Sequence, residues 1–338
     1  MRRLRWRQAS LWIGLLVSLV FAYLAVRDVD VAAFGTALRE MEYWVLAPAA
    51  LVLAVAIFLR AERWRLLFAP RSRPSTRAIT ASLLIGYLFN NILPARAGEA
   101  ARIIALKQRA GTARFEALGT VVAERALDVV CLIILLFAVA PTLPGVDWLP
   151  RALAIGGGVS AGLVAVLLAM AFYGDRPARL LLRPLSLLPG ISGERTDSAA
   201  ANLVYGFSFL RRPGSAAAAV ALTLASWLLI AVSFWLCLVG FEFGIGFEAG
   251  LLVVVATNLA MILPSGPAAL GVFEAATLVA LAVFGVDRSS ALSYAIVVHA
   301  LTVLPFIVVG YVVLHHHASV LRRRAGGTAE AGAAGEGG

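Results

Sequence analysis

Long apolar runs separated by clusters of arginine dominate the pattern along the chain. A membrane-crossing helix needs about 18 or more consecutive apolar residues, and several runs here reach that length. The sequence therefore predicts an all-α, polytopic transmembrane bundle with about six full spans. The runs expected to cross are 11–26, 44–59, 116–140, 152–172, 215–239 and 290–314.

Two further apolar stretches are interrupted and do not fit a simple crossing. The first, 79–93, ends in Asn90-Asn91-Ile92-Leu93-Pro94, and a basic segment follows it. A full crossing there would leave that segment and the arginine-rich loop 173–213 outside, against the positive-inside rule. We therefore expect a re-entrant hairpin at about 79–108 and a second at about 249–286, broken around Pro264 and Pro267. Such breaks are tolerated only where they are buried in protein or line a wet cavity.

Composition supports a single integral membrane domain over 1–324. Hydrophobic residues make up 61% of the 338, and only 14% are charged, too few to cover a soluble domain of this size. The first apolar run lacks a cleavage signature and is expected to remain as a helix. The Gly/Ala/Glu-rich stretch 325–338 is expected to be a disordered tail. The net charge of +10 comes from arginines between the apolar runs, so we expect no nucleic-acid partner.

The arginine distribution also predicts orientation. Both termini and the loop 173–213 are expected on the cytoplasmic side of a bacterial cytoplasmic (inner) membrane, because basic loops stay inside. No nucleotide-binding or hydrolase motif occurs, and Cys131 and Cys237 both lie within apolar runs. We expect no metal, no cofactor and no enzymatic activity in this chain.

The two interrupted stretches echo one another. Each contains Ile-Leu-Pro followed by a glycine and then Glu-Ala-Ala, and each enters from the opposite face. This echo favours an inverted repeat, a pattern that in transporters marks a site near the membrane midplane. The asparagines are expected to cap backbone groups that the breaks set free. The residues assigned to the breaks are Asn90, Asn91, Pro94, Gly98, Asn258, Pro264, Pro267 and Gly271.

Charged side chains inside a span are costly, and one predicted span carries three. Glu124, Arg125 and Asp128 lie within 116–140, at spacings that allow helical neighbours to pair. They form either a satisfied buried ion pair or the wall of a polar site. Their formal charge of −1 calls for a further cation, which Arg96 or Arg102 could supply.

Other charges flank the breaks. Arg96, Glu99 and Arg102 follow the first break, where free backbone N–H groups and arginines favour an anion such as a lipid phosphate. The alternative is an interfacial basic helix that only touches headgroups. Glu274 follows the second break and is expected either to hydrogen-bond the opposite hairpin or to titrate. The segment Arg60–Arg65 is interpreted as a membrane exit with Trp64 as anchor, and His299 as an isolated structural residue.

Together these motifs resemble the lysylphosphatidylglycerol synthase transmembrane region, also called the flippase-like integral membrane family. The resemblance rests on motifs that occur in one order over roughly 10–320: Arg60-Ala61-Glu62-Arg63-Trp64, Asn91 to Glu99 with Arg102, Glu124-Arg125-x-x-Asp128, and Pro264 to Glu274. It implies a helical bundle with two re-entrant elements around a lipid-accessible cavity. We expect no soluble synthase domain like that of the namesake enzymes and therefore carry over no synthase activity. Ala268-Ala269 stands where many relatives have Gly-Gly.

We therefore expect a flippase that moves a phospholipid or a lipid-linked intermediate between leaflets, with membrane lipids as partners. One alternative is a non-transporting membrane partner of an envelope biosynthesis enzyme, docked through 173–213. Another is a lipid-modifying enzyme with Glu124 and Asp128 as acid and base. The expected headgroup-binding residues are Arg96, Glu99, Arg102, Glu124, Arg125, Asp128 and Glu274.

Overall fold

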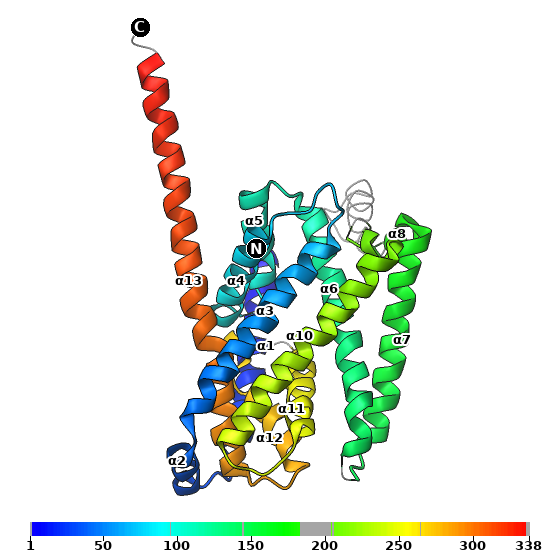
Figure 1. The fold of residues 1–338 in the computed structure, drawn as a ribbon, viewed down its shortest axis with the longest axis vertical. Coiled ribbons are helices and arrows are strands. Elements are labelled where there is room, and N and C mark those ends of the chain that lie inside the picture. The colour runs from blue at the N-terminus through cyan, green and yellow to red at the C-terminus, as the bar shows by residue number, and fades with distance from the viewer. Residues whose placement is uncertain are drawn as a thin grey trace.

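The computed structural model describes residues 2–94, 96–143, 145–182, 204, 206–263 and 265–335. All regular structure within these ranges is helical, which confirms the predicted all-α bundle (Figure 1). Most of the loop 173–213, from 183 to 203, lies outside the described residues, as does Pro264. Six long helices form the frame: α1 (Arg2–Val26), α3 (Leu46–Leu67), α6 (Arg114–Val139), α7 (Leu149–Tyr173), α10 (Pro213–Gly240) and α13 (Arg288–Gly335).

Helices long and apolar enough to cross a membrane confirm a membrane protein. Four described segments meet that standard by length and composition: Tyr43–Leu67, Leu149–Tyr173, Pro213–Gly240 and Arg288–His316. Helix α6 has the length of a crossing but carries the three charged residues noted above. The apolar part of α1, Gly14–Val26, is shorter.

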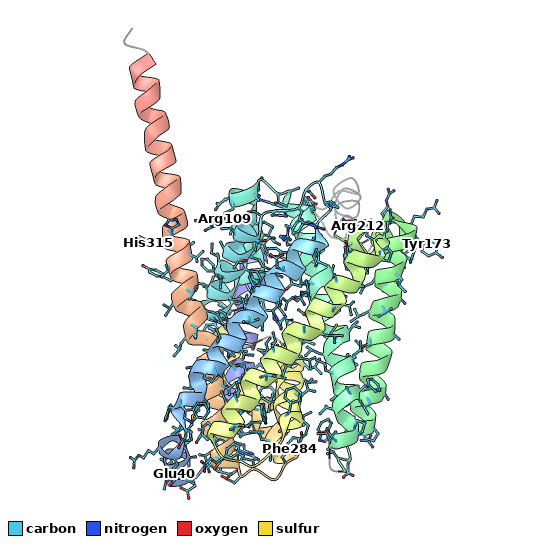
Figure 2. All side chains as sticks on the ribbon, in the orientation of Figure 1. Glu40, Arg109, Tyr173, Arg212, Phe284 and His315 are labelled. Atoms are coloured by element: carbon cyan, nitrogen blue, oxygen red, sulfur yellow. The ribbon has the colours of Figure 1, made fainter. Side chains whose placement is uncertain are left out.

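Two helical hairpins complete the bundle and enter it from opposite ends (Figure 1). In the first, α4 (Thr76–Ile92) leads to a break and α5 (Gly98–Ala110) returns to the same end. In the second, α11 (Phe247–Ala260) leads to a break containing η5 (Pro267–Ala269), and α12 (Val272–Ala282) returns. The first hairpin shares its end with Arg109 and Arg212, whereas Glu40 and Phe284 lie at the other end (Figure 2). The predicted pair of re-entrant elements is therefore present.

Short helices lie at the ends of the bundle. Helix α2 (Val31–Glu40) is capped by the preceding Asp30, whose carboxylate accepts the N–H groups of Ala32 and Ala33 at 2.8 and 3.2 Å. An aspartate at this position satisfies donors that the helix itself leaves free. The other short elements are η1 (Tyr43–Val45), η2 (Ala140–Thr142), α8 (Asp175–Leu182) and η4 (Ser208–Arg211).

Packing divides into two apolar clusters. The larger joins α10, α11, α12 and α13 around Phe234, Phe273 and Tyr294. The smaller surrounds Trp64 near the end that holds the first hairpin. Helix α3 packs along α10 and α1 packs against α12, so the second hairpin is enclosed by helices from both halves of the chain.

The predicted membrane exit at Leu59 is wrong. Helix α3 continues to Leu67, about two turns beyond the predicted exit at Leu59, and it buries Arg60, Arg63 and Trp64. The arginines there meet protein partners instead of water, which a hydropathy pattern does not reveal.

Candidate functional site

The first break turns on a residue in a left-handed backbone conformation. Leu93 is extended, and Arg96 has a φ of 52°, uncommon for a residue other than glycine. The side-chain oxygen of Asn90 accepts the N–H of Gly98 at 2.9 Å and so satisfies a donor at the start of α5. The asparagine thus has the capping role expected for it. Asn91 instead reaches toward the carbonyl of Val303 on α13, at 3.5 Å.

Gly98 allows α4 and α5 to touch. A Cβ atom added at Gly98 would lie 1.9 Å from the carbonyl oxygen of Gly86 and 2.6 Å from the Asn90 side-chain oxygen. No side chain fits there without separating the two helices. The glycine therefore fixes the close hairpin that places Arg96 and Glu99 at its tip.

The second break is more strongly bent. Ala268 and Ala269 have φ values of 53° and 57°, and Gly271 has a φ of 84°. The Ala-Ala pair therefore adopts the conformation that glycine would adopt with less strain. Helix α1 braces this break, because the hydroxyl of Ser18 accepts the N–H of Gly266 at 2.8 Å. Asn258 does not cap the break, since its amide donates to Val254 in its own helix at 2.9 Å.

The two breaks meet inside the bundle. The Arg96 guanidinium donates to the carbonyl oxygen of Met261, directly linking the first hairpin to the second. Beside this contact lies a cavity of about 510 Å³. Its polar lining comes from both hairpins and from α3 and α6: Arg60, Tyr87, Asn90, Asn91, Arg96, Glu99, Arg125, Asn258 and Ser265.

Exposed apolar residues flank the cavity. Leu93 from the first break and Ile262 and Leu263 from the second line it and are 40, 59 and 46% exposed. All three belong to the breaks of the two hairpins, so the border of the cavity is apolar where the hairpins turn. The cavity thus combines a polar interior with an apolar border.

A buried ion network supports one side of the cavity. It contains three arginines and three carboxylates, so its formal charges balance: Arg63, Arg102 and Arg125 with Glu99, Glu124 and Asp128.

Arg63 and Arg102 hold the most deeply buried members of the network. Arg63 lies 3.0 Å from Glu124 and 2.5 Å from Asp128. Arg102 lies 2.9 Å from Glu124 and 2.5 Å from Glu99, and its guanidinium lies over the ring of Trp64 at 4.7 Å. Such pairs offset the cost of burial only when their geometry and hydrogen bonds are good. Arg63 and Arg102 each donate one hydrogen bond to a carboxylate, whereas their Nε atoms have no hydrogen-bond partner among the described residues.

Arg125 stands at the cavity side of the network. It approaches Glu124 at 2.7 Å, Asp128 at 3.5 Å and Glu99 at 3.7 Å, and it remains partly exposed. Its position makes it the network cation that a bound molecule can reach.

The sequence interpretation missed Arg63 as a partner. It balanced the charge of −1 on α6 with Arg96 or Arg102, whereas Arg102 and Arg63 both contribute. The two carboxylates together with Arg125 needed one cation, and Glu99 from the first hairpin adds a further negative charge. A count that included Glu99 would have called for a second arginine.

The predicted headgroup residues separate into three groups. Arg96, Glu99 and Arg125 line the cavity. Arg102, Glu124 and Asp128 lie behind them, with Glu124 and Asp128 only 1 and 4% exposed. Glu274 stands apart from the network, on α12.

Glu274 caps its own helix and pairs with His299. One carboxylate oxygen accepts the N–H of Gly271 at 2.6 Å, and the other lies 2.5 Å from the Nδ1 atom of His299. The Nε2 atom of His299 lies 2.9 Å from the carbonyl oxygen of Ala268, and its ring stacks on Phe273. His299 is therefore not isolated, as the sequence interpretation had it, but connects α13 to the second break.

Comparison with known protein families gives one assignment. The family described as "Lysylphosphatidylglycerol synthase TM region" matches residues 11–310. No curated protein matches the chain.

Proposed function

Since the chain belongs to the lysylphosphatidylglycerol synthase transmembrane-region family, whose function is membrane-embedded and lipid-related, we propose that it moves a phospholipid or a lipid-linked intermediate between the two leaflets. The observation that carries this proposal is the cavity at the meeting of the two helix breaks. It offers polar and cationic groups to a headgroup between two hairpins that enter the bundle from opposite ends.

The apolar rim supports the same function. A translocated lipid must shelter its headgroup while its acyl chains stay in hydrocarbon. Leu93, Ile262 and Leu263 would contact those chains, and Arg96 and Arg125 would receive the phosphate. Glu99 would hold Arg125 in place, while the deeper Arg102, Glu124 and Asp128 would support the wall.

We assign the protein to a bacterial cytoplasmic membrane, with the end that carries the first hairpin facing the cytoplasm. That end includes the exposed Arg71 and Arg77 and the helix end at Arg109, and basic segments favour the cytoplasmic side. The first hairpin would then enter from the cytoplasm and the second from outside. Each leaflet would have a hairpin of its own leading to the shared cavity.

The test is a leaflet-resolved assay in proteoliposomes with fluorescent phospholipids. Accessibility of the label to an external quencher reports how fast lipid crosses. Arg96→Ala is expected to slow crossing about tenfold or more, because a charge-assisted contact to phosphate is lost. The matched control is Arg77→Ala, an exposed arginine on α4 that does not line the cavity. Equal crossing rates for wild type and Arg96→Ala would overturn the role assigned to Arg96.

A second candidate function is that of a non-transporting partner of an envelope biosynthesis enzyme. Helix α7 favours it, since only 11% of its apolar window is buried within the described protein. Gly158 and Gly162 are exposed on α7, and the structure leaves open space for a Cβ atom at both. Small residues at this spacing allow membrane helices to approach closely. A stoichiometric enzyme that co-purifies with the chain and is lost with Gly158→Leu, without lipid movement by the pure chain, would favour this function.

An enzymatic role for Glu124 and Asp128 has less support. An acid and a base must reach the substrate, but both carboxylates are buried and bonded to arginines. A chemically altered lipid recovered from the proteoliposomes would argue for such a role.

A further inference from the structure

A smaller inner chamber of about 160 Å³ adjoins the cavity between the breaks. The two spaces share Arg60, Tyr87, Asn91, Asn258, Met261 and Ala268 in their linings. The inner chamber continues toward Trp227 and Phe234 on α10 and toward His299 on α13. Arg60 therefore lies at the junction between the two spaces.

Arg60 is a buried cation that forms no ion pair with a carboxylate among the described residues. The residue is only 7% exposed, and its Nε and Nη2 atoms have no hydrogen-bond partner among the described residues. Its guanidinium lies over the indole of Trp227 at 4.0 Å. The hydroxyl of Tyr87, which lines both spaces, also has no hydrogen-bond partner among the described residues. Buried donors of this kind are costly unless something accepts from them.

The neighbouring carboxylates are already committed. Arg63, one turn further along α3, forms ion pairs with Glu124 and Asp128. The six-member network as a whole has no net formal charge. Glu99, the carboxylate that lines the cavity, lies 2.5 Å from Arg102. The two cavity arginines outside the network, Arg60 and Arg96, leave the cavity with a formal surplus of positive charge. A ligand that complements this cavity is an anion.

We propose that Arg60 and Tyr87 form an inner binding site for the phosphate of a lipid whose headgroup is anionic as a whole. The inference rests on the proposed lipid function and deepens it. A guanidinium and a hydroxyl can both donate hydrogen bonds to phosphate oxygens. The stacking of the Arg60 guanidinium on the Trp227 ring fixes the orientation of the guanidinium. An aminoacylated headgroup would instead bring an ammonium into a cavity whose carboxylates are paired. The site selects against such cationic lipids.

The experiment measures lipid retention by the full chain in phosphatidylcholine nanodiscs that contain a minor fraction of phosphatidylglycerol. Mass spectrometry of the re-extracted protein gives the enrichment of each lipid. Wild type is expected to enrich phosphatidylglycerol, and Arg60→Gln to lose this enrichment about tenfold or more. Tyr87→Phe is expected to lose a smaller part with its fold unchanged, because it removes a single hydroxyl. The matched control is Arg65→Gln on the same helix, whose partner is Glu62 at 2.7 Å.

Three results would overturn the inference. Equal phosphatidylglycerol enrichment in wild type, Arg60→Gln and Tyr87→Phe would remove the site. Preferential retention of aminoacyl-phosphatidylglycerol would reverse its charge selectivity. Displacement of the lipid by dilute glycerol phosphate from the aqueous phase would assign the site to a soluble phosphate compound.

The same variants separate this inference from the proposed function. Enrichment that depends on Arg60 in a chain that does not move lipid would leave the site standing without translocation. Lipid crossing that is indifferent to Arg60→Gln would leave translocation standing without the site.

Discussion

The two hairpins share a path through the bundle but are stabilised by different forces. The first is held by charge: Glu99 and Arg102 of α5 belong to a six-member ion network with α3 and α6. The second is held by apolar packing, with one Glu274–His299 pair among buried aliphatic and aromatic side chains. The stability of the first hairpin therefore depends on a few charged partners, whereas that of the second is spread over many apolar contacts.

The largest expected effect tests the charged hairpin. Arg102→Leu removes a cation that two carboxylates share and leaves them buried with fewer partners, so it should cost about 3–5 kcal/mol. Unfolding in mixed detergent micelles measures this loss. Arg65→Leu breaks a partly exposed pair with Glu62 and should cost about 1 kcal/mol or less. Similar losses in the two variants would mean that the ion network does not hold the first hairpin.

A second variant tests how closely the helices of the first hairpin must pack. Gly98→Ala places a methyl group against the carbonyl of Gly86 and should cost about 1–3 kcal/mol. It should also slow lipid crossing, because the hairpin tip carries Arg96. The control is Gly158→Ala on α7, where a Cβ atom meets open space. Full stability of Gly98→Ala would show that α4 and α5 can separate freely.

The polar pair of the second hairpin is expected to matter less. Glu274→Leu leaves the Gly271 N–H and the His299 ring without their acceptor and should cost about 1–3 kcal/mol. Glu274→Gln should recover much of this, because an amide can accept from Gly271 and donate to Nδ1. A loss in both variants that matches Arg102→Leu would erase the contrast between the hairpins.

The smallest effect should be a gain in stability. Ala269→Gly relieves a left-handed alanine in the second break and should stabilise the protein by about 1 kcal/mol. Ala256→Gly, inside the regular helix α11, should destabilise it by about 0.5–1 kcal/mol. Opposite signs for these two Ala→Gly changes would locate the strain in the break. Destabilisation by Ala269→Gly would argue against it.

Hydropathy and the placement of arginines were enough to predict the fold. The interrupted run at 79–93 could be assigned as re-entrant because basic loops stay on the cytoplasmic side of the membrane. The end of α3 could not be predicted, since an apolar run stops at the first arginine whether that arginine meets water or a buried carboxylate. The pairing of Arg63 with α6 depends on the register of two helices 60 residues apart. No local pattern records such a register.

Only part of the candidate site could be predicted, because the rest also depends on which distant helices pack together. Arg96, Glu99 and Arg125 could be placed beside the breaks because the breaks are visible as polar interruptions. His299 and Arg60 could not, since each lies in a long helix and becomes a cavity residue only when distant helices pack around it. Glu274 was grouped with the headgroup residues because it follows a break, although its helix directs it toward His299 instead.

The hydrogen bond between Arg96 and the Met261 carbonyl connects ligand binding in the cavity with the contact between the two hairpins. The same guanidinium that ties the hairpins together also lines the cavity. Under the proposed function, a bound phosphate would compete with the Met261 carbonyl for its donors, and a ligand that displaced the carbonyl would loosen the tie between the two hairpins. By linkage, a mutation that loosens the tie should favour the ligand that does so. The empty and loaded protein then differ in how firmly the two hairpins are coupled.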